Sequence, residues 1–168
     1  MLKKNILKIC IIGMPGSGKS TIGRILSSKL DYKFFDTDEK IEDMTKLKIN
    51  DIFIDKGEAY FRELETKVLK NLLDINKVVI STGGGIILKN KNIFNKSYNI
   101  YLHCNLEVLI ERVSRNKDRP LLSKDIEKNM KNLFNQRKDI YNEICDLRIN
   151  ATNKIHRTIT EILDKLPV

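Results

Sequence analysis

Short apolar runs alternate with longer amphipathic segments along this chain. The apolar runs predict five strands, at Lys8–Gly13, Lys33–Asp36, Lys77–Thr82, Asn99–His103 and Leu147–Asn150. The amphipathic segments predict six helices, at Thr21–Leu30, Asp38–Met44, Tyr60–Leu73, Leu106–Arg115, Ile126–Ile144 and Ile155–Leu166. Strands that alternate with helices are typical of a mainly parallel sheet with helices on both faces. We therefore expect an α/β fold, and the length of 168 residues predicts one domain over residues 1–168.

The segment from Gly13 to Thr21 matches GxxxxGK[ST] and directly follows the first predicted strand. A loop between a strand and a helix can wrap backbone N–H groups around a phosphate, and the helix N-terminus adds positive partial charge. Lys19 can reach the β- and γ-phosphates, and the Ser20 hydroxyl can ligate Mg²⁺. A simple glycine-rich turn before a helix does not account for all the fixed positions. The motif predicts a nucleoside triphosphate site.

The net charge of +9 raises the possibility of nucleic-acid binding, because clustered Lys and Arg release counterions from a phosphate backbone. The basic residues are instead spread along the chain among Asp and Glu, and no recognisable nucleic-acid motif is present. We expect no nucleic-acid partner, and the charge favours anionic substrates. No stretch suggests an export signal or a membrane span. The three cysteines lack metal-binding spacing, which favours reduced thiols in a cytoplasmic protein.

The loop motif alone does not choose among a motor, a switch, an ATPase and a kinase. The guanine-reading Asn-Lys-x-Asp and the Asp-x-x-Gly switch are absent from the sequence. Asp36 and Asp38 lie at the end of the second predicted strand, which in an open α/β sheet faces the same crevice as the loop. One carboxylate can support a metal while the other approaches an acceptor hydroxyl. The plainer alternative for Asp38 is the N-cap of the next helix.

A set of motifs in this order closely resembles the shikimate kinase family. The motifs are Gly13 to Thr21, Asp36-Thr37-Asp38, Gly57 to Arg62, Ser81 to Gly85, Arg119 to Leu122, and Gln136-Arg137 with Tyr141. The resemblance covers about the first 145 residues. It implies a five-stranded parallel sheet flanked by helices, similar to nucleoside monophosphate kinases, with a lid loop at about residues 116–124. It also implies Mg²⁺-dependent transfer from ATP to the shikimate 3-hydroxyl, in the pathway to chorismate and the aromatic amino acids.

On the nucleotide side, the resemblance implies a set of phosphate-binding residues in the loop. They are Gly16, Ser17, Gly18, Lys19, Ser20 and Thr21. Mg²⁺ would bind Ser20 and, through water, Asp36. Arg119 in the lid would reach the ATP phosphates and stabilise the transferring group. Arg112 occupies a position compatible with stacking on adenine.

On the acceptor side, the resemblance implies that Asp38 binds the shikimate hydroxyls and is the candidate base. Arg62 and Arg137 would clamp the shikimate carboxylate, a task that suits the planar guanidinium fork. Glu65, one helical turn from Arg62, could fix the rotamer of that arginine. The remaining implied substrate contacts are Gly83, Gly84, Gly85, Phe53 and Phe61.

Plainer interpretations exist for several of these residues. A pair such as Arg62 and Glu65 is usually weak and solvated, three glycines can form a simple tight turn, and helix aromatics are usually core. The rival functions are a kinase for gluconate, a nucleotide or adenylyl sulfate, and a nucleotide-dependent nucleic-acid-binding or regulatory module. We expect a monomer that binds ATP and shikimate, without a nucleic-acid or membrane partner.

Overall fold

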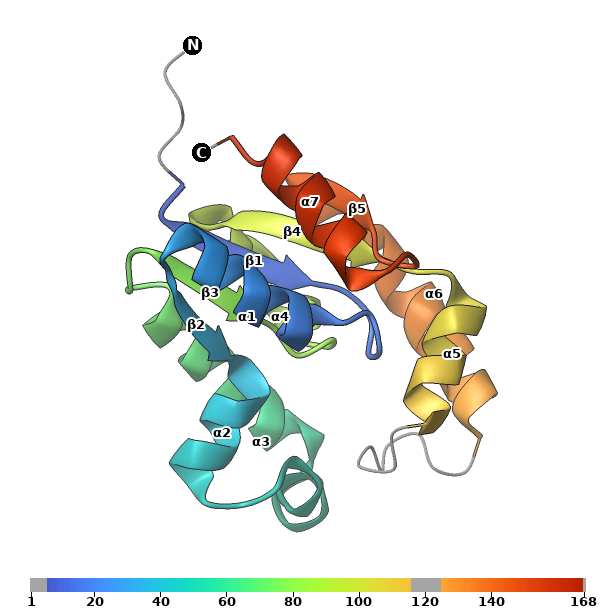
Figure 1. The fold of residues 1–168 in the computed structure, drawn as a ribbon. Coiled ribbons are helices and arrows are strands. Elements are labelled where there is room, and N and C mark those ends of the chain that lie inside the picture. The colour runs from blue at the N-terminus through green and yellow to red at the C-terminus, as the bar shows by residue number, and fades with distance from the viewer. Residues whose placement is uncertain (1–5, 116–124, 168) are drawn as a thin grey trace.

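Within residues 6–115 and 125–167, which this computed structural model describes, five parallel strands form one sheet (Figure 1). The strands pair in the order β2-β3-β1-β4-β5. Their bounds are β1 Lys8–Ile12, β2 Lys33–Asp36, β3 Val78–Ser81, β4 Tyr98–His103 and β5 Leu147–Asn150. All five predicted strands are present, and their ends differ from the prediction by one residue at most. The α/β fold with a five-stranded parallel sheet is therefore confirmed.

Helices cover both faces of the sheet (Figure 1). The helices are α1 Lys19–Leu30, α2 Thr37–Thr45, α3 Ile49–Leu72, α4 Ile87–Asn90, α5 Leu106–Arg115, α6 Ile126–Ile144 and α7 Ile155–Lys165, with the 3-10 helix η1 at Lys91–Lys96. Helices α1 and α7 pack together on one face, while α4 and α6 pack together on the other. Strands β1 and β3 lie in the middle and are almost wholly buried, as expected for a parallel sheet with two covered faces. No helix of these residues combines the length and the apolar character needed to cross a membrane.

Helix α3 begins much earlier than the predicted helix at Tyr60. The missed part runs from Ile49 to a kink at Gly57, where φ is 79° and ψ is 170°. Only glycine adopts this conformation readily. The kink separates two helical segments, which explains why the sequence pattern predicted only the second one. Helix α4, with four residues, and η1, with six, were also missed, because each is shorter than the window of about 11 residues over which helical periodicity can be recognised.

A buried asparagine joins three elements at the start of β4. The Asn99 amide donates to the backbone oxygens of Phe94 and Ile144, at 3.0 Å each, and its oxygen accepts from the Ser97 hydroxyl at 2.7 Å. These bonds connect η1, β4 and the end of α6. Because Asn99 is 3% exposed, water cannot replace its hydrogen bonds easily.

We expect Asn99→Ala to lower the free energy of unfolding by about 2–4 kcal/mol, because it removes three hydrogen bonds of a buried side chain and takes the donor away from the Ile144 oxygen. Urea unfolding followed by circular dichroism measures this loss. Asn95→Ala is the control, since Asn95 lies in η1 but is exposed. Equal stability of the two variants would contradict the structural role of Asn99.

Candidate active site

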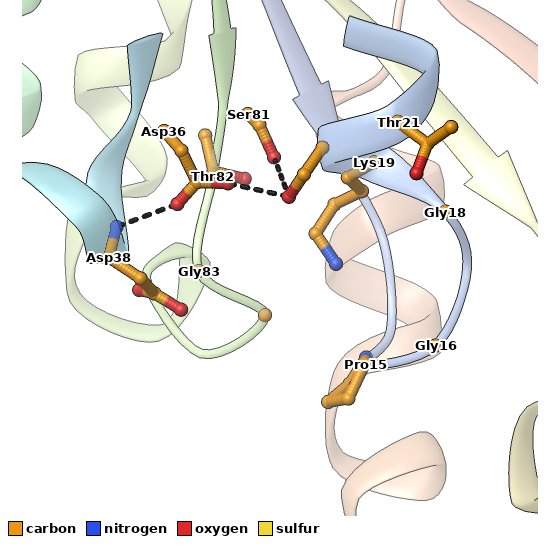
Figure 2. A pocket seen from close by; sticks show the side chains of 12 residues that line it. Pro15, Gly16, Gly18, Lys19, Thr21, Asp36, Asp38, Ser81, Thr82 and Gly83 are labelled. Atoms are coloured by element: carbon orange, nitrogen blue, oxygen red, sulfur yellow. Dashed lines mark hydrogen bonds between the residues drawn. The ribbon is translucent and has the colours of Figure 1, made fainter. Parts of the chain in front are cut away.

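A pocket of about 250 Å³ lies at the C-terminal edge of the sheet, between three loops. Its walls come from the loop after β1, the end of β2 with the start of α2, and the turn after β3. Figure 2 shows Lys19 on one side of this pocket and Asp38 on the other, with Gly83 close to Asp38. The prediction that the Gly13–Thr21 loop and the Asp36–Asp38 segment face one crevice is confirmed.

The loop after β1 depends on backbone conformations that favour glycine. The φ angles of Gly16 and Gly18 are 83° and 89°, and Gly18 is the last residue before α1. At Gly13 a Cβ atom would lie only 2.9 Å from the Leu102 oxygen. The Lys19 ammonium donates to the oxygens of Gly13 and Met14, at 3.0 and 2.9 Å, so the cation lies inside the curve of the loop. A buried cation in a glycine loop at a helix N-terminus is suited to phosphate.

Oxygen atoms from three elements meet beside the loop. The Ser20 hydroxyl donates to Asp36 Oδ2 at 2.6 Å and lies 3.2 Å from the Ser81 hydroxyl. No group of three or more His, Cys, Asp and Glu in the described part of the chain could hold a metal. Hydroxyl and carboxylate oxygens with room for waters and phosphate are nevertheless what Mg²⁺ requires. Ser20 and Asp36 therefore fit a nucleotide-bound magnesium ion.

Asp36, and not Asp38, is the N-cap of α2. Asp36 Oδ1 accepts from the backbone nitrogens of Asp38 and Glu39, at 2.9 and 3.4 Å. The alternative that Asp38 serves as this cap is therefore wrong. Asp38 lies in the first turn of the helix, and its carboxylate approaches Gly83, where a Cβ would lie 2.9 Å from Asp38 Oδ1.

Arg62 and Glu65 form a buried ion pair rather than a solvated one. Arg62 Nη1 donates to Glu65 Oε2 at 2.6 Å, and the two side chains are 9% and 1% exposed. Glu58 Oε1 accepts from Arg62 Nε and Nη2, at 3.2 and 3.0 Å. Burial alone would lower the pKa of Arg62, but the two carboxylates more than compensate and raise it. The expectation that Glu65 contacts Arg62 is confirmed.

Arg137 of α6 is the second buried cation of this region, at 6% exposed. Burial lowers its pKa, and the nearby positive charge of Arg62 adds to this effect. Its Nε atom is buried and has no hydrogen-bond partner among the described residues. Two buried guanidinium groups near each other favour an anionic ligand, and a carboxylate can accept from both.

The glycine turn, residues 83–85, lies directly against these side chains. A Cβ built on Gly83 would lie 2.7 Å from Glu65 Oε1. At Gly84 it would lie 3.2 Å from Arg137 Nη1, and at Gly85 it would lie 2.6 Å from both terminal nitrogens of Arg62. None of these glycines has a positive φ, so close approach, and not conformation, requires them.

Other predicted residues are less directly connected to the pocket. The rings of Phe53 and Phe61 lie in contact, with centroids 4.7 Å apart and planes tilted by 41°, and both residues lie outside the pocket lining. Arg112 donates to the carbonyl oxygens of Gly16, Ala151 and Thr152, so it links the loop after β1 to the turn after β5. Their substrate and adenine contacts stay predictions. Arg119 and the predicted lid at residues 116–124 lie outside the described residues.

Two hydroxyl groups that anchor the glycine turn were not predicted from the sequence. The Gly83 nitrogen donates to the Thr37 hydroxyl at 2.9 Å, and the Tyr141 hydroxyl donates to the Gly84 oxygen at 2.5 Å. Both residues lie inside motifs that the sequence contains, Asp36-Thr37-Asp38 and Gln136-Arg137-x-x-x-Tyr141. The motifs contain both residues, but they do not indicate which group either hydroxyl contacts.

The parallel sheet and the glycine loop between β1 and α1 define a P-loop nucleotide-binding fold. The sequence profile of the family described as "Shikimate kinase" matches residues 15–167. The chain is 45% identical over 163 residues to the shikimate kinase of Microcystis aeruginosa, covering 95% of this chain and 84% of the relative. It therefore belongs to the shikimate kinase family.

Solved structures agree with this assignment. A shikimate kinase from Bacteroides thetaiotaomicron aligns with a TM-score of 0.91 at 27% identity, covering 97% of this chain and 99% of that one. A shikimate kinase from Acinetobacter baumannii, in complex with shikimate, aligns with a TM-score of 0.87 at 33% identity, covering 96% of each chain. The resemblance inferred from the sequence motifs is confirmed.

The buried ion pair predicts a pH dependence of stability. Burial raises the pKa of Glu65 from 4.5 to about 7, against the opposing effect of Arg62. Because the folded pKa is the higher one, the unfolded chain loses this proton first as the pH rises. The contribution of Glu65 to stability should be complete below about pH 4.5 and should be lost as the pH rises to about 7.

Urea unfolding of the wild type and of Glu65→Gln, measured from pH 4 to pH 8, tests this dependence. We expect the unfolding free energy of the wild type to fall relative to that of Glu65→Gln as the pH rises across that window. Glu63→Gln is the control, because Glu63 lies on the exposed side of the same helix. A difference that stays constant with pH would show that Glu65 ionises as in the unfolded chain.

Proposed function

We propose that this protein transfers the γ-phosphoryl group of ATP to the 3-hydroxyl of shikimate and releases 3-phosphoshikimate and ADP. The observation that carries the proposal is the position of two buried guanidinium groups, Arg62 and Arg137, against the glycine turn that faces the P-loop. Such a site provides cations for an acceptor carboxylate beside a site for phosphate. The reaction belongs to the pathway to chorismate and the aromatic amino acids.

The P-loop forms the donor side of this site. The glycines let its backbone curve around the ATP phosphates, and the Lys19 ammonium neutralises charge on the β- and γ-phosphates. When Mg²⁺ enters with ATP, Ser20 would bind it and Asp36 would hold its waters, and the ion would offset phosphate charge. Arg119, whose position the structure does not describe, is proposed to stabilise the transferring group.

Asp38 and the arginine pair form the acceptor side. Asp38 is held at the first turn of α2 beside the glycine turn, where its carboxylate can accept hydrogen bonds from shikimate hydroxyls. Phosphoryl transfer with a loose transition state asks little of a base, so we assign Asp38 mainly to positioning the 3-hydroxyl. Arg62 and Arg137 fix the opposite end of the acceptor through its carboxylate.

We also propose that residues 1–168 act as one domain and as a monomer in the cytoplasm. The pocket is formed by one chain, and the buried apolar side chains form one core. The cysteines at positions 10, 104 and 145 are free thiols, as is common in a reducing compartment.

We expect Lys19→Met to remove phosphoryl transfer while the protein still folds. The substitution keeps the length of the side chain but removes the charge that would lie on the phosphates. Turnover should fall more than 100-fold, equivalent to about 3 kcal/mol in the barrier, in an assay of ADP release. Thermal unfolding should remain cooperative. Turnover above a tenth of the wild-type value would show that the P-loop does not bind the reacting phosphates.

We expect Arg137→Ala to lower kcat/KM for shikimate about 30- to 1000-fold, because it removes a charge-assisted contact worth roughly 2–4 kcal/mol. Arg137→Lys should recover only part of this loss, since an ammonium keeps the charge but not the planar fork. The KM for ATP should change little. ADP release with shikimate, gluconate and nucleoside monophosphates as acceptors gives these values.

Arg148→Ala is the matched control, because Arg148 is exposed on β5, outside the pocket lining. It should leave shikimate kinetics unchanged. A wild-type preference for gluconate or a nucleotide would refute the proposed acceptor. Unchanged shikimate kinetics in Arg137→Ala would refute the role of this arginine.

A further inference from the structure

The hydroxyl group of Tyr141 forms a hydrogen bond to the glycine turn, in addition to the packing of its ring in the core. Tyr141 lies one helical turn after Arg137 on α6 and is fully buried. Its ring stacks on Tyr101, with centroids 5.0 Å apart and planes at 23°, while its hydroxyl donates to the Gly84 oxygen at 2.5 Å. Burial raises the pKa of Tyr141, so the phenol stays protonated and able to donate at neutral pH.

The glycine turn is held from its other side as well. The nitrogen of Gly83 donates to the hydroxyl of Thr37 at 2.9 Å, and Thr37 is fully buried at the first position of α2. Two successive residues of one turn are thus anchored to different helices, Gly83 to α2 and Gly84 to α6. Backbone bonds from Ile86 and Leu88 hold the oxygens of Gly83 and Gly85, whereas the Gly84 oxygen accepts from the Tyr141 hydroxyl. The Tyr141 bond is therefore the hydrogen bond that restrains the Gly84 carbonyl among the described residues.

Gly84 lies where the acceptor side meets the P-loop. A Cβ built on it would lie 3.1 Å from Pro15 Cδ, 3.2 Å from Arg137 Nη1 and 3.4 Å from the Gly13 oxygen. The turn therefore separates Arg137 from the loop that would carry the phosphates. A small displacement of Gly84 changes the distance between donor and acceptor, and a misplacement of about 1 Å can cost on the order of 100-fold in rate.

We propose that Tyr141 is a positioning residue for phosphoryl transfer, which it controls by fixing the Gly84 carbonyl and thereby the spacing between the acceptor site and the P-loop. The proposal rests on the proposed function only for the choice of acceptor. Tyr141 touches neither the phosphates nor the acceptor in this role. Its hydroxyl also interacts with the Arg137 guanidinium. Loss of the hydroxyl should therefore lower the rate of transfer most, acceptor binding to a smaller degree, and ATP binding little.

Tyr141→Phe tests the proposal, because it keeps the ring and its stacking on Tyr101 and removes only the hydroxyl. We expect kcat to fall about 10- to 100-fold, with the KM for ATP within about twofold and the KM for shikimate changed less than kcat. Hydrogen exchange should become faster at the amides of the glycine turn, which measures the loosened backbone without any substrate.

Tyr32→Phe is the matched control. The Tyr32 hydroxyl also donates to a backbone oxygen, that of Ile6, at 2.6 Å, and this bond is far from the pocket lining. The control variant should lose similar stability but keep its kcat. A kcat of Tyr141→Phe within twofold of the wild type, or an equal fall in both variants, would overturn the proposal.

The second anchor gives an independent check. Thr37→Ser keeps the hydroxyl that accepts from Gly83 and should retain most of the activity, whereas Thr37→Val removes it and should lower kcat as Tyr141→Phe does. If the wild type prefers another acceptor, the proposed function fails, and the same comparison of kcat values with that acceptor still decides the role of Tyr141. Equal activity of Thr37→Ser and Thr37→Val would contradict the anchoring of the turn.

Discussion

The Asp36 carboxylate accepts hydrogen bonds from both halves of the site. One oxygen accepts from Ser20 at the start of α1, and the other accepts from the backbone nitrogens of Asp38 and Glu39 in the first turn of α2. The helix that follows the P-loop and the helix that carries Asp38 are therefore fixed to one side chain at the end of β2. Because Asp36 is 8% exposed, water competes weakly for these bonds. The relative position of nucleotide and acceptor depends on this group.

The acceptor side shows how burial changes the meaning of a sequence pattern. Arg62 and Glu65 at i and i+3 are commonly a weak surface pair, yet here both are removed from water. A buried ion pair adds little net stability, because desolvation opposes the attraction, but breaking it by removing one partner is costly. Its role is better understood as geometric. Glu65 and Glu58 hold the Arg62 guanidinium from two directions and leave its orientation little freedom.

The sequence was sufficient for the strands and for the P-loop, because a continuous apolar run and a fixed glycine spacing each correspond to one local structure. It was not sufficient to choose which of Asp36 and Asp38 caps α2, since both satisfy the same local preference and tertiary contacts with Ser20 decide. The burial of Arg62 was equally hidden, since it depends on Gly85, a residue distant in sequence. The helix before Gly57 was missed because that residue interrupts the periodicity in the middle of α3.

In the glycine turn, the glycines are required by the space that neighbouring side chains occupy and not by their own backbone conformation. The space where each Cβ would lie is taken by side chains from elsewhere in the chain, namely Glu65 and Asp38 at Gly83, Pro15 and Arg137 at Gly84, and Arg62 at Gly85. An alanine at any of the three positions would leave the backbone conformation allowed but displace an ionic group. Substitution of any of these glycines should therefore be poorly tolerated, because the new side chain would occupy the place of a charged one. A compensating substitution would have to shorten the side chain that faces the glycine. Mutational tolerance at such a turn reports on side chains that are remote in sequence.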